Sequence, residues 1–163
     1  MSLQDPTLLA PGDGEHSWFL NNLFTLKAGG ETTGGLITVM EFTGPAGWGP
    51  PPHVHHVEDE MFYVVEGEIS FWCDGKSATY GPGGFAWLPK KLPHRFEIGA
   101  DGPARVLQLT TPAQFEHFVR ALGEPATEAR LPEPTEPDVE RLVRVCAEFN
   151  IDILAPEPVE ATR

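Results

Sequence analysis

The sequence predicts an all-β barrel or sandwich with helices packed on its outside. First, its 17 Gly and 17 Pro residues follow no repeating period, which indicates many turns and short strands. Second, alternating apolar runs separated by turn signals recur between residues 36 and 110. Third, the apolar spacing changes from strand-like to helical after residue 112. Strands followed by helices in one chain of 163 residues fit a single β domain with a helical C-terminal piece.

Residues 1–34 are interpreted as an N-terminal arm and two edge strands. The first 15 residues are polar and contain two prolines and two glycines, which favours a loosely held arm. The apolar runs 18–20 and 23–26 are expected to be short strands, and two glycine pairs at 29–30 and 34–35 bracket a turn.

Residues 35–112 are expected to form the barrel core. Alternation from Glu60 onward places Phe62 on the inward face together with Glu60, whereas Met61, Tyr63 and Val65 face outward. The other strands of this core are expected at 36–42, 68–73, 76–80, 85–88, 94–98 and 105–110.

Residues 113–163 form a helical appendage in this interpretation. Apolar residues at helical spacing predict a helix over 112–122, with Gly123 at its end. Residues 124–137 are rich in proline and glutamate and are expected to be a linker. A second apolar stripe predicts another helix over 138–149.

Potential metal ligands are concentrated between residues 53 and 60. His53 and His55 are two residues apart, so their side chains share one face of an extended segment. The three prolines before them favour extension and exclude a helix. Residues 56–59 are expected to form a solvated turn that returns Glu60 to the same point, and His94 is the candidate for a fourth ligand.

This stretch resembles the first motif of the cupin superfamily. The motif reads Gly47, five residues, His53-x-His55, four residues, Glu60, six residues and Gly67. The resemblance covers roughly residues 35–112 and implies a cupin-type double-stranded β-helix, a jelly-roll barrel.

The second cupin motif is matched with two departures. Gly83, Pro89 and His94 stand at the family's spacing, and the resemblance implies that His94 is the last metal histidine. Lys91 replaces a glycine and Ile98 replaces an asparagine. Neither position is a ligand, so the implied metal site stays complete.

Three imidazoles and one carboxylate suit one divalent transition metal ion. Inward polar groups in an apolar barrel are costly unless they are satisfied, and an ion satisfies all four together. Fe, Mn, Ni, Co and Zn all accept such ligands, and the alternative is a barrel that keeps the motif without metal. Aromatic residues near these ligands either line a substrate cavity or fill the barrel: Phe42, Trp48, Phe62, Trp87 and Phe96.

A second, short resemblance concerns function. Residues 115–123 are similar to the helix that follows the barrel in quercetinase-like single-domain cupins. The resemblance implies a metal-dependent dioxygenase acting on a flavonol-like or other enolisable hydroxylated aromatic, with Glu60 as ligand and catalytic base. Two alternatives remain: a metal-dependent isomerase or cyclase of a small carbonyl compound, and a non-enzymatic small-molecule binding module.

Composition limits the partners. A net charge of -13 argues against nucleic acid and anionic membranes, so a small-molecule substrate is expected. Two cysteines, no basic signal region and no long apolar run favour a reducing cytoplasm. Apolar side chains at 61, 63 and 65 on the outer face predict a homodimer.

Overall fold

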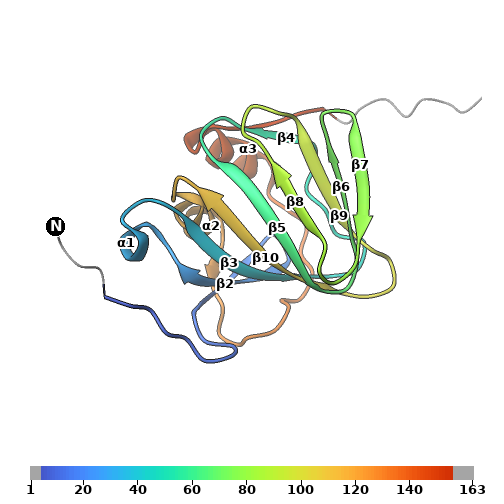
Figure 1. The fold of residues 1–163 in the computed structure, drawn as a ribbon. Helices are drawn as coiled ribbons and strands as arrows, with labels where there is room; N and C mark the ends of the chain where they lie inside the picture. The colour runs from blue at the N-terminus through green and yellow to red at the C-terminus, as the bar shows by residue number, and fades with distance from the viewer. Residues whose placement is uncertain (1–4, 156–163) are drawn as a thin grey trace, which may run out of the picture.

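Two antiparallel sheets form the framework of the protein, here a computed structural model that describes residues 5–155 (Figure 1). The larger sheet contains, in spatial order, β11 (Glu124–Pro125), β1 (Glu15–Phe19), β2 (Asn22–Ala28), β3 (Thr38–Gly44), β10 (Ala104–Thr111), β5 (Asp59–Glu66) and β8 (Phe85–Leu88). The smaller sheet contains β12 (Ile151–Ile153), β4 (His53–His55), β9 (His94–Ile98), β6 (Ile69–Cys73) and β7 (Lys76–Tyr80). The predicted jelly-roll architecture is thus confirmed.

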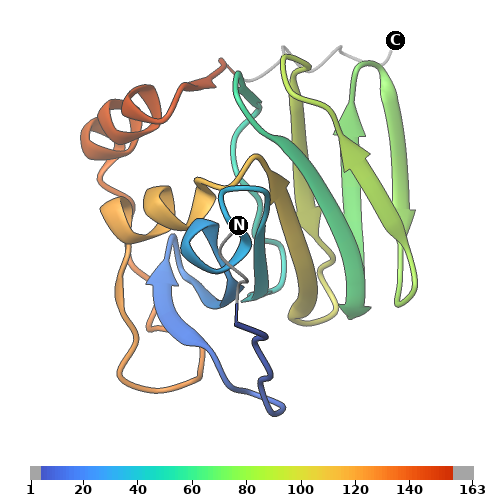
Figure 2. The same ribbon diagram turned by 60° about the vertical axis from the view of Figure 1, so that its left-hand side comes forward.

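The two longer helices, α2 (Phe115–Leu122) and α3 (Val139–Glu148), lie outside the sheets as expected. They stand side by side at one edge of the sandwich, joined by the extended linker (Figure 2). Asp138 caps α3, because its side chain accepts a hydrogen bond of 2.9 Å from the backbone N–H of Arg141. The expected glycine-bracketed turn contains a single helical turn, α1 (Gly30–Thr33).

The core lies between the two sheets and follows the predicted alternation. Phe62 and Val64 on β5 are fully buried, as are Ile69 on β6 and Val106 on β10. Burial of each such side chain stabilises the fold by about 1.5–3 kcal/mol. Aromatic side chains extend this core toward the helices, since Phe19 contacts Phe118 with their ring centroids 5.3 Å apart.

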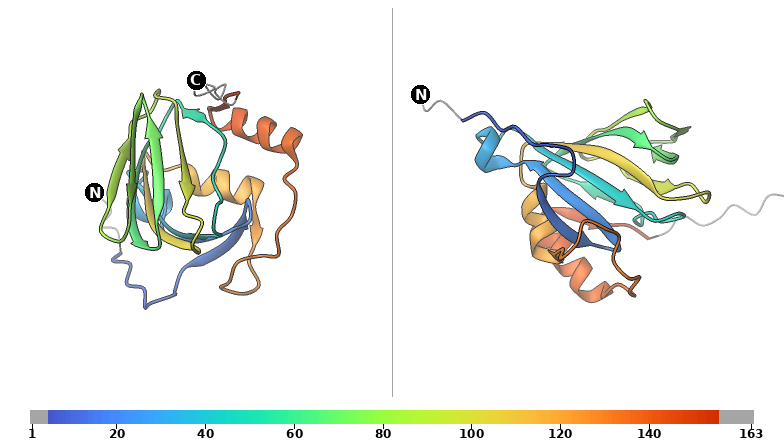
Figure 3. Two further views of the ribbon diagram at one scale, coloured as in Figure 1. Left: turned by 90° about the vertical axis from the view of Figure 1, so that its right-hand side faces the viewer. Right: turned by 90° about the horizontal axis from the view of Figure 1, so that it is seen from below.

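The last described strand, β12, was not predicted. It pairs antiparallel with β4, with Ile151 opposite His55 and Ile153 opposite His53. Three residues are too few to produce a recognisable alternation, so the sequence alone gave no signal for this pairing. The consequence is that the segment after α3 holds the strand that carries two histidines, at the edge of the sandwich where α3 lies (Figure 3).

Within residues 5–155, no helix is long and apolar enough to span a membrane.

Candidate metal centre

Four side chains from three strands meet inside the sandwich. His53 and His55 come from β4, Glu60 from β5 and His94 from β9, and their potential ligand atoms all lie within 4.8 Å of one another. All four residues are buried, with exposed fractions of 8%, 2%, 2% and 3%. The structure therefore brings together the predicted ligand set, which we call the ligand cluster.

The turns around the cluster explain the motif's glycines and one of its departures. Gly47 and Gly67 both have positive φ, at 72° and 78°, and a Cβ atom at Gly67 would lie 2.6 Å from the carbonyl oxygen of Pro103. Lys91 also has a positive φ of 68°, although the family has glycine there. Its backbone N–H donates to the carbonyl oxygen of His55 at 2.7 Å, which compensates for a left-handed conformation that costs about 1–2 kcal/mol.

The imidazole rings are oriented by hydrogen bonds through Nδ1. In His53 this atom lies 2.9 Å from the carbonyl oxygen of Pro51, and in His94 it lies 3.0 Å from the carbonyl oxygen of Leu92. A carbonyl only accepts, so Nδ1 must carry the proton in both rings. A neutral ring then has its lone pair on Nε2, the form that binds a metal ion.

These lone pairs converge on a carboxylate. The Nε2 atoms of His94 and His55 lie 2.9 Å and 3.4 Å from Oε2 of Glu60. Acceptor atoms so close repel one another unless a cation lies between them. Ligand atoms about 2.1 Å from one ion are about 3.0 Å apart when adjacent and about 4.2 Å apart when opposite, so ligand atoms that all lie within 4.8 Å of one another suit one divalent ion. The residues therefore fit a metal ion; its identity is not determined by them.

Glu58 completes the surroundings of His55, and the expectation that it lies in a solvated turn was wrong. Its side chain is only 1% exposed, and Oε1 accepts a hydrogen bond from Nδ1 of His55 at 2.9 Å. Its other oxygen, Oε2, accepts from the amide of Gln114 at 2.5 Å. Sequence spacing does not reveal this role, because Gln114 is 56 residues away and an acidic residue next to a turn is usually exposed.

The protonation states of His53 and Glu60 at neutral pH are those that bind metal ions. Burial and the neighbouring His94 lower the pKa of His53 to about 4. Burial opposes ionisation of Glu60, yet the neighbouring His55 outweighs it and holds the pKa of Glu60 at about 2. At pH 7, Glu60 is therefore an anion and His53 is neutral, the forms in which both bind metals.

A small cavity of about 70 Å³ adjoins the cluster, and we call it the inner cavity. Trp48 and Phe96, which were expected either to line a cavity or to fill the barrel, line it. Phe42 and Phe62 do not; they are buried behind it, with ring centroids 6.5 Å apart, and fill the barrel. The prediction for Trp87 was wrong: it is 60% exposed, because its neighbour Leu88 points inward and successive strand residues alternate.

The two C-terminal helices and β12 supply a wall that the sequence interpretation missed. Phe115 and Phe118 from α2, Leu142 and Cys146 from α3, and Ile151 from β12 all line the inner cavity. For the four helical residues, the spacing in the sequence predicted only that they form the apolar faces with which the helices pack against the core. Only the three-dimensional arrangement indicates that these faces close the cavity beside the ligand cluster.

Comparison with known proteins defines the class of protein. The cupin domain family matches residues 40–125, more than half of the chain, and this protein belongs to that family.

Among characterised proteins, quercetin 2,3-dioxygenase of Bacillus subtilis is 26% identical over 152 residues. That similarity covers 93% of this chain but 45% of the relative, so the chain spans about half the relative's length. Two solved structures share the fold alone. An RmlC-like cupin from Shewanella frigidimarina is 15% identical, covers 71% of this chain and 99% of its own, and has a TM-score of 0.57. KdgF from Halomonas is 18% identical, covers 60% of this chain and 84% of its own, and has a TM-score of 0.52.

Proposed function

We propose that this protein is a metal-dependent dioxygenase acting on a flavonol-like or other enolisable hydroxylated aromatic. The observation that carries the proposal is the buried ligand cluster in a chain whose relative over 93% of its length is a quercetin dioxygenase. Two histidines with fixed Nδ1 protons and one ionised carboxylate form a site prepared for a divalent ion. The small-molecule substrate remains an expectation that agrees with the charge of -13.

A divalent transition ion at this site supplies Lewis acidity toward a substrate hydroxyl and, where it is redox-active, electron transfer to dioxygen. Glu60 is the candidate acceptor of the hydroxyl proton. Gln108 donates to its Oε1 at 2.8 Å and keeps that oxygen in place. Both atoms of dioxygen enter the product, so the reaction consumes no external reductant.

The test is oxygen consumption by the metal-reconstituted protein with quercetin as substrate. We expect one dioxygen consumed for each quercetin, no conversion under nitrogen, and loss of both in the His53→Ala and His94→Ala variants. Conversion at equal rates under air and nitrogen would instead indicate the isomerase or cyclase alternative. Binding without conversion would indicate the binding module.

A further inference from the structure

The inner cavity is too small to hold the whole of a multi-ring substrate. Its volume of about 70 Å³ is less than half that of a cavity of about 150 Å³ that binds benzene. Sites for drug-sized ligands occupy about 300–1,000 Å³. Only the reacting edge of such a molecule fits beside the ligand cluster, and the rest must lie elsewhere.

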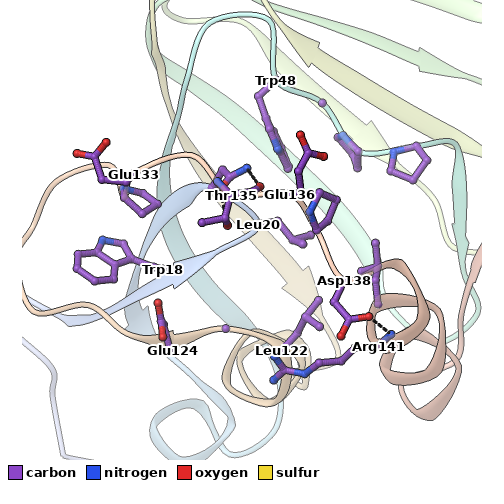
Figure 4. A pocket seen from close by; sticks show the side chains of 18 residues that line it. Trp18, Leu20, Trp48, Leu122, Glu124, Glu133, Thr135, Glu136, Asp138 and Arg141 are labelled. Atoms are coloured by element: carbon purple, nitrogen blue, oxygen red, sulfur yellow. Dashed lines mark hydrogen bonds between the residues drawn. The ribbon is translucent and has the colours of Figure 1, made fainter.

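A second cavity lies directly outside the first, and we call it the outer cavity. Its volume is about 550 Å³, within the range of ligand sites. Its walls come from β1, the segment before β4, the end of α2, the linker and α3 (Figure 4). The residues that line both cavities are Leu20, Trp48, Pro50, Pro51 and Leu142. The outer cavity is thus continuous with the wall of the metal site.

Two indole rings give the outer cavity an aromatic surface. Trp18 projects from β1, and its ring is held by a hydrogen bond of 2.9 Å from Nε1 to the carbonyl oxygen of Arg130 in the linker. Trp48 lies at the boundary with the inner cavity, where its ring centroid is 5.8 Å from that of Phe96. Rings fixed in this way stack on planar aromatic ligands at little cost in side-chain entropy.

The charged side chains that line the outer cavity are mostly acidic, and one of them, Glu133, is paired with Arg130 at 3.9 Å. The acidic residues in its lining are Glu124, Glu133, Glu136 and Asp138. Arg141 is the only basic residue in the lining, and its guanidinium Nη2 donates to the carbonyl oxygen of Ala121 at 3.0 Å. The surrounding field therefore repels anions and tolerates neutral or cationic molecules.

From these features we propose that the outer cavity is a substrate subsite for the body of a planar aromatic molecule that carries no anionic group. The substrate then straddles both cavities, with its reacting edge beside the ligand cluster and its remaining rings against Trp18 and Trp48. The proposal rests on the proposed function for the identity of the reacting edge, but the subsite itself is defined by binding. It selects substrates by charge as well as by shape.

The experiment measures binding without turnover, using protein loaded with redox-inert Zn(II) under nitrogen. Calorimetric titrations compare catechol, which spans one ring, with quercetin and with a quercetin sulfonate. We expect Trp18→Ala to weaken quercetin binding roughly three- to tenfold and catechol binding less than twofold. Trp18→Phe keeps an aromatic ring and is expected to restore most of the quercetin affinity, which separates loss of stacking from misfolding.

Charge reversal tests selectivity. The Glu133→Lys and Glu136→Lys double variant is expected to strengthen binding of the sulfonate about tenfold while changing catechol binding little. The matched control is Glu31→Lys, an exposed position on α1 outside the cavity lining. Equal effects on quercetin and catechol from Trp18→Ala, or wild-type binding of the sulfonate as tight as that of quercetin, would overturn the subsite.

The experiments distinguish failure of the dioxygenase proposal from failure of the subsite proposal. If quercetin binds as expected but is not consumed in air by protein loaded with Fe(II), Mn(II), Co(II) or Ni(II), the dioxygenase proposal is wrong and the subsite stands. If quercetin is consumed in air but the outer-cavity variants leave its affinity unchanged, the subsite is wrong and the dioxygenase proposal stands.

Discussion

The buried carboxylate of Glu58 accepts a hydrogen bond of 2.9 Å from Nδ1 of His55, whose Nε2 faces Glu60 in the ligand cluster. Glu58 would therefore act on a metal ion bound in the cluster through the imidazole of His55 rather than by direct coordination. Such carboxylate–histidine pairs fix the ring orientation and raise the basicity of the coordinating nitrogen.

We expect Glu58→Gln to weaken metal affinity by about 10- to 100-fold, the usual effect of losing an outer carboxylate. The glutamine keeps the shape and one acceptor oxygen, so the fold is retained. Competition with a chelator measures the change, and Glu68→Gln, an exposed position in the turn before β6, is the matched control. An unchanged affinity in Glu58→Gln would mean that the backbone alone orients His55.

Metal binding is expected to stabilise the protein. An ion present at 100 times its dissociation constant adds about 2.7 kcal/mol to the free energy of unfolding, or about 5–10 °C in Tm for a domain of this size. Thermal unfolding with and without added Zn(II) measures this shift, which should disappear in the His53→Ala and His94→Ala double variant. Elemental analysis of protein purified without added metal identifies the natural ion. An equal shift in the double variant would place the binding elsewhere.

The pairing of β12 with β4 predicts that the segment after α3 supports the metal site. Ile151 is 4% exposed, lies opposite His55 and lines the inner cavity. Ile151→Ala is expected to cost about 2–5 kcal/mol in stability and to weaken metal binding as the strand loosens. Val139→Ala, at a 62% exposed position of α3, should change neither. Chemical denaturation together with chelator competition checks both, and unchanged metal affinity despite lost stability would show that β4 holds its position without β12.

The buried thiol of Cys146 is expected to make the protein less stable at alkaline pH. Burial raises the pKa of its thiol to about 11 from an ordinary value of 9, so the folded protein binds this proton more tightly than the unfolded chain. The stabilising contribution is full below pH 9 and disappears as the pH rises to about 11. Urea unfolding at pH 8 and at pH 10.5 should therefore show a smaller decline in Cys146→Ala than in the wild type. Equal declines would mean that the thiol is not buried in solution.

The features that could be predicted from the sequence were those that depend on the spacing of residues close together in the chain. Alternation placed Phe62 on the inward face, where it is buried, and the motif predicted that His53 and His94 meet. The rest depends on contacts between distant segments. The hydrogen bond between Glu58 and Gln114 spans 56 residues, and β12 is too short for its pairing with β4 to leave a pattern. The outward position of Trp87 follows from alternation with Leu88, but its place near a ligand-bearing loop made it a candidate for the cavity lining in the sequence interpretation.

The outer face of the larger sheet carries a row of apolar side chains across the three neighbouring strands β8, β5 and β10. Strand register aligns Trp87 with Met61, and Met61 with Leu109. It also aligns Phe85 with Tyr63, and the exposed fractions of Tyr63, Phe85 and Trp87 are 46%, 53% and 60%. Monomeric proteins seldom expose contiguous apolar surface of this kind.

We propose that a second copy of the chain covers this face. The arginine beside it, Arg105, is already paired with Glu41 and Glu66 at 3.3 Å and 2.8 Å, so two such faces can meet without an unpaired charge. Sedimentation of the wild type at micromolar concentration should show a dimer, and Trp87→Arg should give a monomer because the introduced charges would face each other's apolar surface. Tyr80→Arg, at a 41% exposed position of the smaller sheet, should remain dimeric. A wild-type monomer at these concentrations would rule out this arrangement.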